Sequence, residues 1–210
     1  MLSFYNQLYA RKVKVWPSEE VVAFVEANRS KLIGGKVIDI GCGAGRHTIY
    51  MARRGIDAYG VDQSPVAIDY GRRWAEQEGL MAGFDVKDFQ DLPYHDESFV
   101  GAIAWESLFF GSTPSVRKGI QEVFRVLKPG AGFFLLLKSK DDFRFHCFPR
   151  LDLHCVESEQ GIPVTCFTRE EIERAFLCRA SNLNIEISNH SLDNGRKTIA
   201  NFIVSGQKKS

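Results

Sequence analysis

The sequence lacks several features that would place it in a specialised class of protein. Its 27 Lys plus Arg and 26 Asp plus Glu leave a net charge of +1, without the basic surplus typical of nucleic-acid binders. The longest uncharged apolar run, 131–137, is far shorter than the ~20 residues of a membrane-spanning helix. Five scattered cysteines are unlike the dense, even set of a disulfide scaffold. The first 12 residues have apolar before basic residues, the reverse of a signal peptide. We therefore expect a reduced, cytoplasmic protein.

What the sequence does contain is typical of one globular α/β domain. An apolar content of 44% over 210 residues is enough for a core without disulfide or metal support. Short apolar runs alternate with helical stretches, which predicts a parallel sheet with right-handed crossovers. The expected strands are 37–40, 58–61, 83–86, 99–104, 131–137, 184–188 and 198–205. The expected helices lie within 1–31, between 46 and 55, within 64–79, between 113 and 128, and from 168 onward.

The turn after the first expected strand is rich in glycine. In open α/β sheets, ligands bind beyond the carboxyl ends of the strands, and glycine lets the backbone approach them closely. Residues 41–45 read Gly-Cys-Gly-Ala-Gly, with Arg46 where a dinucleotide-binding loop has its third glycine. The Walker lysine pattern is also absent. Asp39 would repel a pyrophosphate and suits a ligand that presents an amino group. The alternative is a tight turn that binds nothing.

Two more carboxylates follow expected strands. Asp62 ends the second strand, 21 residues after Gly41, where a carboxylate can accept hydrogen bonds from ribose hydroxyls. The alternative for Asp62 is a helix cap or a surface charge. Asp88 follows the third strand and precedes Phe89, a pair that suits an adenine amino group and ring. A simple turn residue is an equally good interpretation of Asp88.

Four segments together resemble a known family. VIDIGCGAGRHTIYMARRG, GVDQSP, KDFQDLPYHDESF and EVFRVLKPGAGFF, within about 36–138, resemble the successive motifs of class I S-adenosylmethionine-dependent methyltransferases. The resemblance implies an α/β fold, a Rossmann-like doubly wound seven-stranded sheet, mostly parallel with an antiparallel last strand. It implies S-adenosyl-L-methionine as cofactor, with Gly41 and Gly43 along its methionine half and Asp39 near its amino group. It also implies Asp62 at the ribose, and Asp88 with Phe89 at the adenine.

We expect a single methyltransferase domain over 1–210. Its parts are an N-terminal helical cover (1–35), a cofactor-binding core (36–138), a substrate cover (139–166), and a final helix with two strands (167–210). The segment 139–166 breaks the helix and strand periodicity. Its Phe143, Phe145 and Phe148 either wall a substrate pocket or pack the segment onto the domain.

No residue shows a clear catalytic pattern. Glu106, which follows the fourth strand, is a candidate general base or ammonium anchor, and a solvated loop charge is as good an interpretation. His146 is a candidate proton acceptor, although a lone histidine is more often not catalytic. Trp105 suits core packing or a position beside the sulfonium. The pairs His146-Cys147 and His154-Cys155 lack the spacing of zinc sites, so we expect no metal.

The type of acceptor follows from motifs that are missing. No Asn or Asp followed by Pro-Pro-Tyr or Pro-Pro-Phe comes after the fourth strand, which disfavours methylation of adenine or glutamine nitrogens. No cysteine lies there, which disfavours cytosine C5 methylation. We expect a small-molecule substrate, with no nucleic acid and no membrane as partner. Methylation of RNA or protein, and a non-catalytic S-adenosylmethionine-binding protein, are the alternatives, while the loop spacing disfavours a nicotinamide dehydrogenase.

Overall fold

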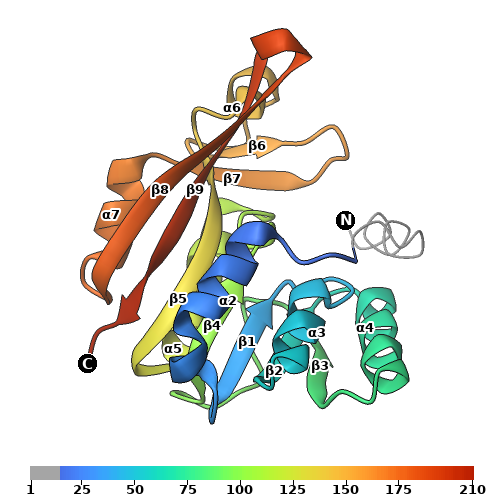
Figure 1. Ribbon diagram of the computed structural model, residues 1–210. Coiled ribbons are helices and arrows are strands. Elements are labelled where there is room, and N and C mark those ends of the chain that lie inside the picture. Colours follow the sequence, from blue (N-terminus) through green and yellow to red (C-terminus); the bar gives the residue numbers. More distant parts are fainter. Residues whose placement is uncertain (1–14) are drawn as a thin grey trace.

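A nine-stranded sheet crosses the part of the chain that the computed structural model describes, residues 15–210 (Figure 1). The strands are β1 (Lys36–Ile40), β2 (Asp57–Asp62), β3 (Ala82–Val86), β4 (Phe99–Ala104), β5 (Leu127–Ser139), β6 (Cys155–Glu157), β7 (Pro163–Phe167), β8 (Ala180–Leu192) and β9 (Lys197–Lys208). The helices are α2 (Glu19–Leu32), α3 (Arg46–Arg53), α4 (Pro65–Gln77), α5 (Thr113–Val126), α6 (Phe143–Cys147) and α7 (Arg169–Phe176), and the turn η1 (Asp193–Gly195) joins β8 to β9. The helix expected within residues 1–14 lies outside the described residues.

The topology confirms the predicted α/β sheet. Strands β3, β2, β1, β4 and β5 are neighbours in that order and run parallel. The last strand, β9, pairs antiparallel with β5, and β8 pairs with the far side of β9. These are the seven strands that the resemblance implies.

The hairpin of β6 and β7 is an addition to those seven strands. It pairs with β5 only at the end of that strand, through Lys138 with Cys166 and Ser139 with Phe167. The hairpin and α6 occupy the segment in which no periodicity was found. Strands of three and five residues and a helix of five are too short to produce a recognisable period.

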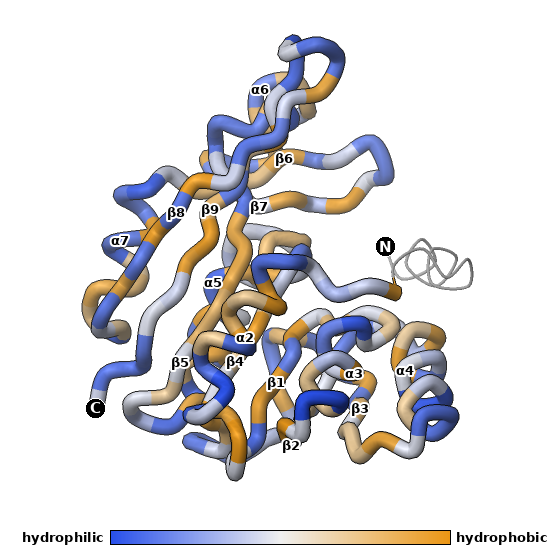
Figure 2. Tube along the Cα trace, viewed as in Figure 1, coloured by the Kyte–Doolittle hydropathy of each residue, from blue (hydrophilic) through white to orange (hydrophobic). Residues whose placement is uncertain are grey.

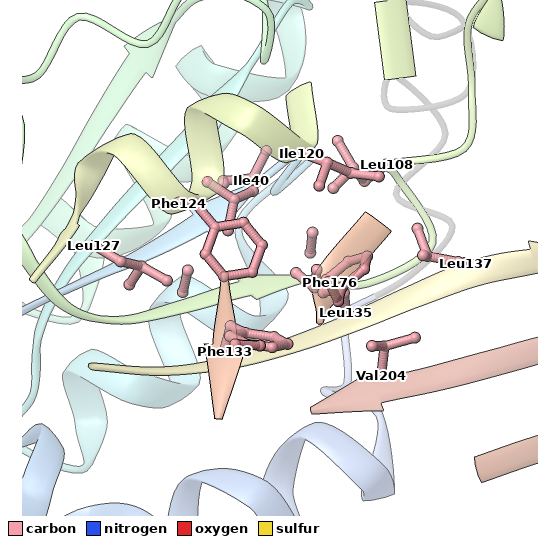
Figure 3. Packing of buried hydrophobic residues seen from close by; sticks show 14 of the residues in the cluster. Ile40, Leu108, Ile120, Phe124, Leu127, Phe133, Leu135, Leu137, Phe176 and Val204 are labelled. Carbon is pink, nitrogen blue, oxygen red and sulfur yellow. The ribbon is translucent and has the colours of Figure 1, made fainter. Parts of the chain in front are cut away.

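Helices cover both faces of the sheet. Helices α5 and α7 bury their apolar sides on one face, where Phe124, Phe133 and Phe176 meet (Figure 3). Helices α2 and α3 contribute to the cluster on the other face. Figure 2 shows the hydrophobic residues concentrated in the central strands and the hydrophilic ones toward the tip of the β8–β9 ribbon. Among residues 15–210, no helix combines the length and apolarity needed to cross a membrane.

Hydrogen-bonded caps mark the residues at which α4 and α7 begin. Ser64 Oγ accepts a hydrogen bond from Ala67 N, with Pro65 at the first helical position. Thr168 and Glu171 form the predicted capping box of α7. Because strands β1 to β5 are parallel, the segments that follow them lie at the same edge of the sheet.

Candidate active site

A pocket lies at the carboxyl ends of the first four strands. Its lining residues are Gly41, Val61, Asp62, Gln63, Lys87, Asp88, Phe89, Glu106, Ser107 and Phe110. They come from the segments after β1, β2, β3 and β4, or from the strand ends themselves. The structure therefore brings the predicted residues Gly41, Asp62, Asp88, Phe89 and Glu106 together, although they span 66 positions of the chain.

The glycine loop is shaped by the segment that crosses it. Gly41 has φ +68°, and a Cβ there would collide with the side chain of Ser107. The Ser107 hydroxyl donates a hydrogen bond of 2.6 Å to the Ile40 carbonyl, which fastens the segment after β4 onto the loop. Gly45 has φ +87°, and the ring of Phe84 occupies the space beside it. The glycines thus serve close packing as well as any approach of a ligand.

Asp62 is held by two backbone amides. Its Oδ2 accepts from Gly43 N at 3.0 Å and its Oδ1 from Ser64 N at 2.8 Å. Burial raises the pKa of Asp62, and these two hydrogen bonds oppose that rise. Gly43 does not itself line the pocket; it acts through Asp62, whose carboxylate it helps to fix at the pocket wall.

Asp39 does not reach the pocket. It lies within β1, paired with Gly60 of β2, and is only 1% exposed. Thr48 Oγ1 of α3 donates a hydrogen bond of 2.8 Å to its Oδ2. Burial raises the pKa of Asp39 to about 6, and the hydrogen bond from Thr48 opposes that rise. The structure therefore places this carboxylate beneath the loop, whereas the sequence suggested a position beside the ligand.

Asp88 and Phe89 form the far wall of the pocket. Asp88 is exposed, and its Oδ1 accepts from Gln90 N at 2.9 Å, which is the turn role that the sequence left open. The same residue lines the pocket, so the two interpretations of Asp88 are compatible. The ring of Phe89 is half-buried and rests on Gly119 of α5.

The segment after β4 carries Glu106 in a strained backbone conformation. Glu106 has φ +56°, a left-handed value that non-glycine residues adopt at a cost and that often accompanies function. Its Oε2 lies 2.8 Å from Nη2 of Arg46, and Nη1 of Arg46 donates to the Trp16 carbonyl at 3.3 Å. Glu106 is thus a paired carboxylate rather than a freely solvated one. Trp105 is 8% exposed and stacks on Phe134 at 5.4 Å, which identifies it as core.

The segment 139–166 touches the pocket only indirectly. None of its residues lines the pocket, and His146 lies exposed on α6. Phe145 is buried and the rings of Phe143 and Phe148 are in contact, so these aromatic residues pack the segment down. Strand β7 instead bonds to the segment after β4, through Thr165 N to the Phe109 carbonyl and Gly111 N to the Pro163 carbonyl. The segment braces the loop that carries Phe110.

Sequence reasoning did not single out several lining residues. Gln63, Lys87 and Phe110 were missed, although the first two directly adjoin a predicted site residue. Their position next to the strand ends could have identified Gln63 and Lys87 as lining residues. Phe110 carried no such signal, because its position depends on the β7 contact.

Comparison with known proteins assigns this architecture to a family. Residues 37–130 match the family described as a methyltransferase domain. The chain is 33% identical over 129 residues to the 2-heptyl-1-hydroxyquinolin-4(1H)-one methyltransferase of Mycobacteroides abscessus, covering 60% of this chain and 55% of that protein. A structure of a SAM-dependent methyltransferase from Methanosarcina mazei aligns with TM-score 0.68 and 26% identity, covering 87% of this chain and 97% of that one. The sequence match and the fold together identify residues 37–130 as a class I S-adenosylmethionine-dependent methyltransferase domain.

A further relative of this chain is the probable chloroplastic tocopherol O-methyltransferase of Oryza sativa subsp. japonica. It is 29% identical over 130 residues, which cover 60% of this chain and 35% of that protein. The chain thus spans between about a third and just over half of these two curated relatives. The region that matches the family model, 37–130, contains the pocket segments that follow β1, β2, β3 and β4.

The donor set of the pocket suits S-adenosylmethionine, the cofactor of this methyltransferase family. Asp62 and Asp88 supply carboxylate acceptors for hydroxyl and amino groups, and Phe89 supplies an aromatic surface for a base. At Gly41 the missing side chain leaves backbone in the pocket wall, where a ligand can approach closely. The residues present therefore fit a nucleoside ligand that carries hydroxyl and amino groups.

Proposed function

We propose that this protein transfers the methyl group of S-adenosylmethionine to a small-molecule acceptor. The proposal rests on one observation: Gly41, Asp62, Asp88 and Phe89 share a pocket with the Glu106 segment. The first four form the cofactor side, and the Glu106 segment forms the acceptor side. One relative is named as a methyltransferase of 2-heptyl-1-hydroxyquinolin-4(1H)-one and another as a probable tocopherol O-methyltransferase. Both names support a small acceptor.

The chain's part in the reaction is binding and alignment. S-adenosylmethionine, when bound, supplies a methyl group that the sulfonium already activates. Asp62, fixed by Gly43 and Ser64, holds the ribose hydroxyls, and Asp88 with Phe89 holds the adenine. Alignment of two reactants in one site can supply ~7–11 kcal/mol of a barrier. The pocket therefore needs no elaborate set of catalytic side chains.

Glu106 is our candidate for the residue that contacts the acceptor. Arg46 pairs with its carboxylate, which keeps the side chain at the pocket wall and lowers its value as a free base. We therefore assign Glu106 the role of orienting an acceptor that donates a hydrogen bond. His146, exposed on α6, has no part in this proposal.

The two covers act through contacts on the pocket rim. We assign 139–166 a substrate-covering role exerted through the bonds of β7 to residues 109–111. Residues 16–18 of the N-terminal cover, 1–35, are fastened to α3, because Arg46 donates to the Trp16 carbonyl and Ser18 N donates to His47 Nε2. Hydrogen exchange with and without S-adenosylhomocysteine tests this: protection should rise across 106–111 and 139–166. Unchanged exchange in both ranges would contradict a cover.

Calorimetry with S-adenosylmethionine, S-adenosylhomocysteine and NAD tests the proposed function. We expect both adenosyl ligands to bind and NAD to bind more weakly, because the loop has Arg46 where a dinucleotide loop has glycine. Formation of S-adenosylhomocysteine with a panel of hydroxyquinolines and phenols tests turnover. Tighter binding of NAD would refute the proposal. Binding without turnover, on hydroxylated, amino and thiol acceptors alike, would favour a non-catalytic binder.

The remaining assignments concern partners and location. We propose that the protein acts without nucleic acid, on the basis of its net charge of +1, and a filter-binding assay with bulk RNA tests this. We propose a cytoplasmic location because all five cysteines are free thiols in the structure. Fractionation of the cells that make the protein tests the location.

A further inference from the structure

A second groove lies between α5 and α7, on the opposite face of the sheet from α2 and α3. It has an apolar floor and a cationic rim. The floor is formed by Ile120, Phe167 and Ala175, and the rim by Arg117, Gln121, His154, Glu171, Arg174 and Arg179. The groove shares no lining residue with the candidate active site.

Three guanidinium groups of this groove have no carboxylate partner. Within residues 15–210, seven other arginines lie within 4.0 Å of a carboxylate oxygen, whereas Arg117, Arg174 and Arg179 do not. Arg174 Nε donates to the Glu170 carbonyl at 3.2 Å, and Arg179 Nη1 donates to the Ala175 carbonyl at 3.1 Å. The Arg179 bond satisfies a carbonyl at the end of α7, and Arg179 Nη1 also donates to Cys178 Sγ at 3.6 Å. The other donors of the three arginines are available to a ligand.

The acidic residue in the lining is already neutralised. Glu171 Oε1 lies 2.8 Å from Lys140 Nζ and 3.3 Å from His154 Nδ1. Burial alone would raise the pKa of Glu171, but the hydrogen bonds from Lys140 and Thr168 hold it below its usual value. Glu171 is therefore an ionised, satisfied carboxylate, and the arginines keep the groove positive.

We propose that this groove binds a multiply charged oxyanion of the phosphate class. Guanidinium forks match the oxygens of phosphate in pairs, and three of them exceed what a single carboxylate would neutralise. The buried floor residues Ile120 and Phe167 keep water from one side of the groove, which strengthens the attraction between the arginines and an anion. The same floor can contact the apolar part of a phosphate ester.

Titration of the full-length protein with inorganic pyrophosphate, followed by calorimetry, tests the proposal. We expect saturable binding at one site, weakened at least tenfold in Arg117→Ala and in Arg174→Ala. The Arg117 side chain makes no hydrogen bond or ion pair within residues 15–210, so we expect its replacement to leave the fold intact, and binding of S-adenosylhomocysteine checks this. Arg196→Ala is the matched control. Arg196 lies in the turn between β8 and β9, is exposed, has no ion pair within residues 15–210 and does not line the groove, so its replacement should change the affinity less than twofold.

A second titration identifies the source of the phosphate group. Phenyl phosphate binding more tightly than inorganic phosphate would show that the ligand is an ester whose body lies on the floor. Equal affinities would show an inorganic anion. Either result supports the oxyanion site. It is overturned if pyrophosphate shows no saturable binding, or if Arg196→Ala weakens binding as much as Arg117→Ala does. Because the two sites share no residue, failure here leaves the proposed methyl transfer untouched.

Discussion

Replacement of Asp62 separates its structural role from its proposed contact with the cofactor. The carboxylate accepts hydrogen bonds from Gly43 N and Ser64 N, so Asp62→Ala leaves two amides without their partner. Asp62→Asn keeps the shape and one acceptor oxygen. The two amides belong to buried residues, and a buried donor left without a partner costs roughly 1–3 kcal/mol, so we expect Asp62→Ala to lower the free energy of unfolding by at least that amount. Asp62→Asn should lower it by less.

Binding should respond differently from stability. If the carboxylate holds the ribose, both variants lose hydrogen bonds to a charged acceptor, and affinity for S-adenosylhomocysteine falls roughly ten- to a hundred-fold. Calorimetry gives the affinity and urea unfolding gives the stability, with Asp91→Asn as the control because Asp91 is exposed and outside the pocket lining. An unchanged dissociation constant in Asp62→Ala would refute the ribose contact, whatever happens to stability.

Substitutions at three further positions test the pocket and the carboxylate beneath its glycine loop. Gly41→Ala collides with Ser107 and has φ +68°, so we expect urea unfolding to show a loss of about 2–4 kcal/mol; a smaller loss would contradict the contact. Glu106→Asn and Glu106→Ala both lose the Arg46 contact, but asparagine tolerates φ +56°, so Glu106→Asn should be about 1 kcal/mol the more stable, and equal melting temperatures would argue against strain. Folding raises the pKa of Asp39 from 3.8 to about 6, so its charge destabilises the protein increasingly from pH 4 to 6. Asp39→Asn should therefore raise the free energy of unfolding by up to about 3 kcal/mol at pH 7.5 and by nothing near pH 4. Urea unfolding at several pH values measures this, and a pH-independent difference would contradict it.

The cofactor half of the site could be predicted because its determinants are local. A glycine turn or a carboxylate directly after an apolar run reports where a strand ends, and parallel strands end at one edge. The acceptor half depends on contacts between distant residues. Ser107 bonds to Ile40, 67 positions away, and Phe110 bridges to Val164. Neither contact leaves a periodic signal in the sequence.

Asp39 shows a related difficulty. Its position two residues before Gly41 indicated the loop, yet alternation along β1 sends it into the α3 layer, where Thr48 meets it. The start of β5 also differs from the expected strand, 131–137. Strand β5 begins at Leu127 and runs through Pro129 and Gly130, with a register shift against β4 between Phe99 and Gly101.

The way the β6–β7 hairpin is attached has a consequence for engineering. It joins the sheet at the last two residues of β5 and is otherwise held by the rim of the pocket, while β9 completes the sheet on its own along β5. Residues 139–166 could therefore be exchanged between relatives, provided that the new segment keeps the hydrogen bonds of Asp142 with Ala200 and of Asp152 with Thr113. A chimera built in this way would keep the cofactor half unchanged and would alter only the side from which an acceptor enters.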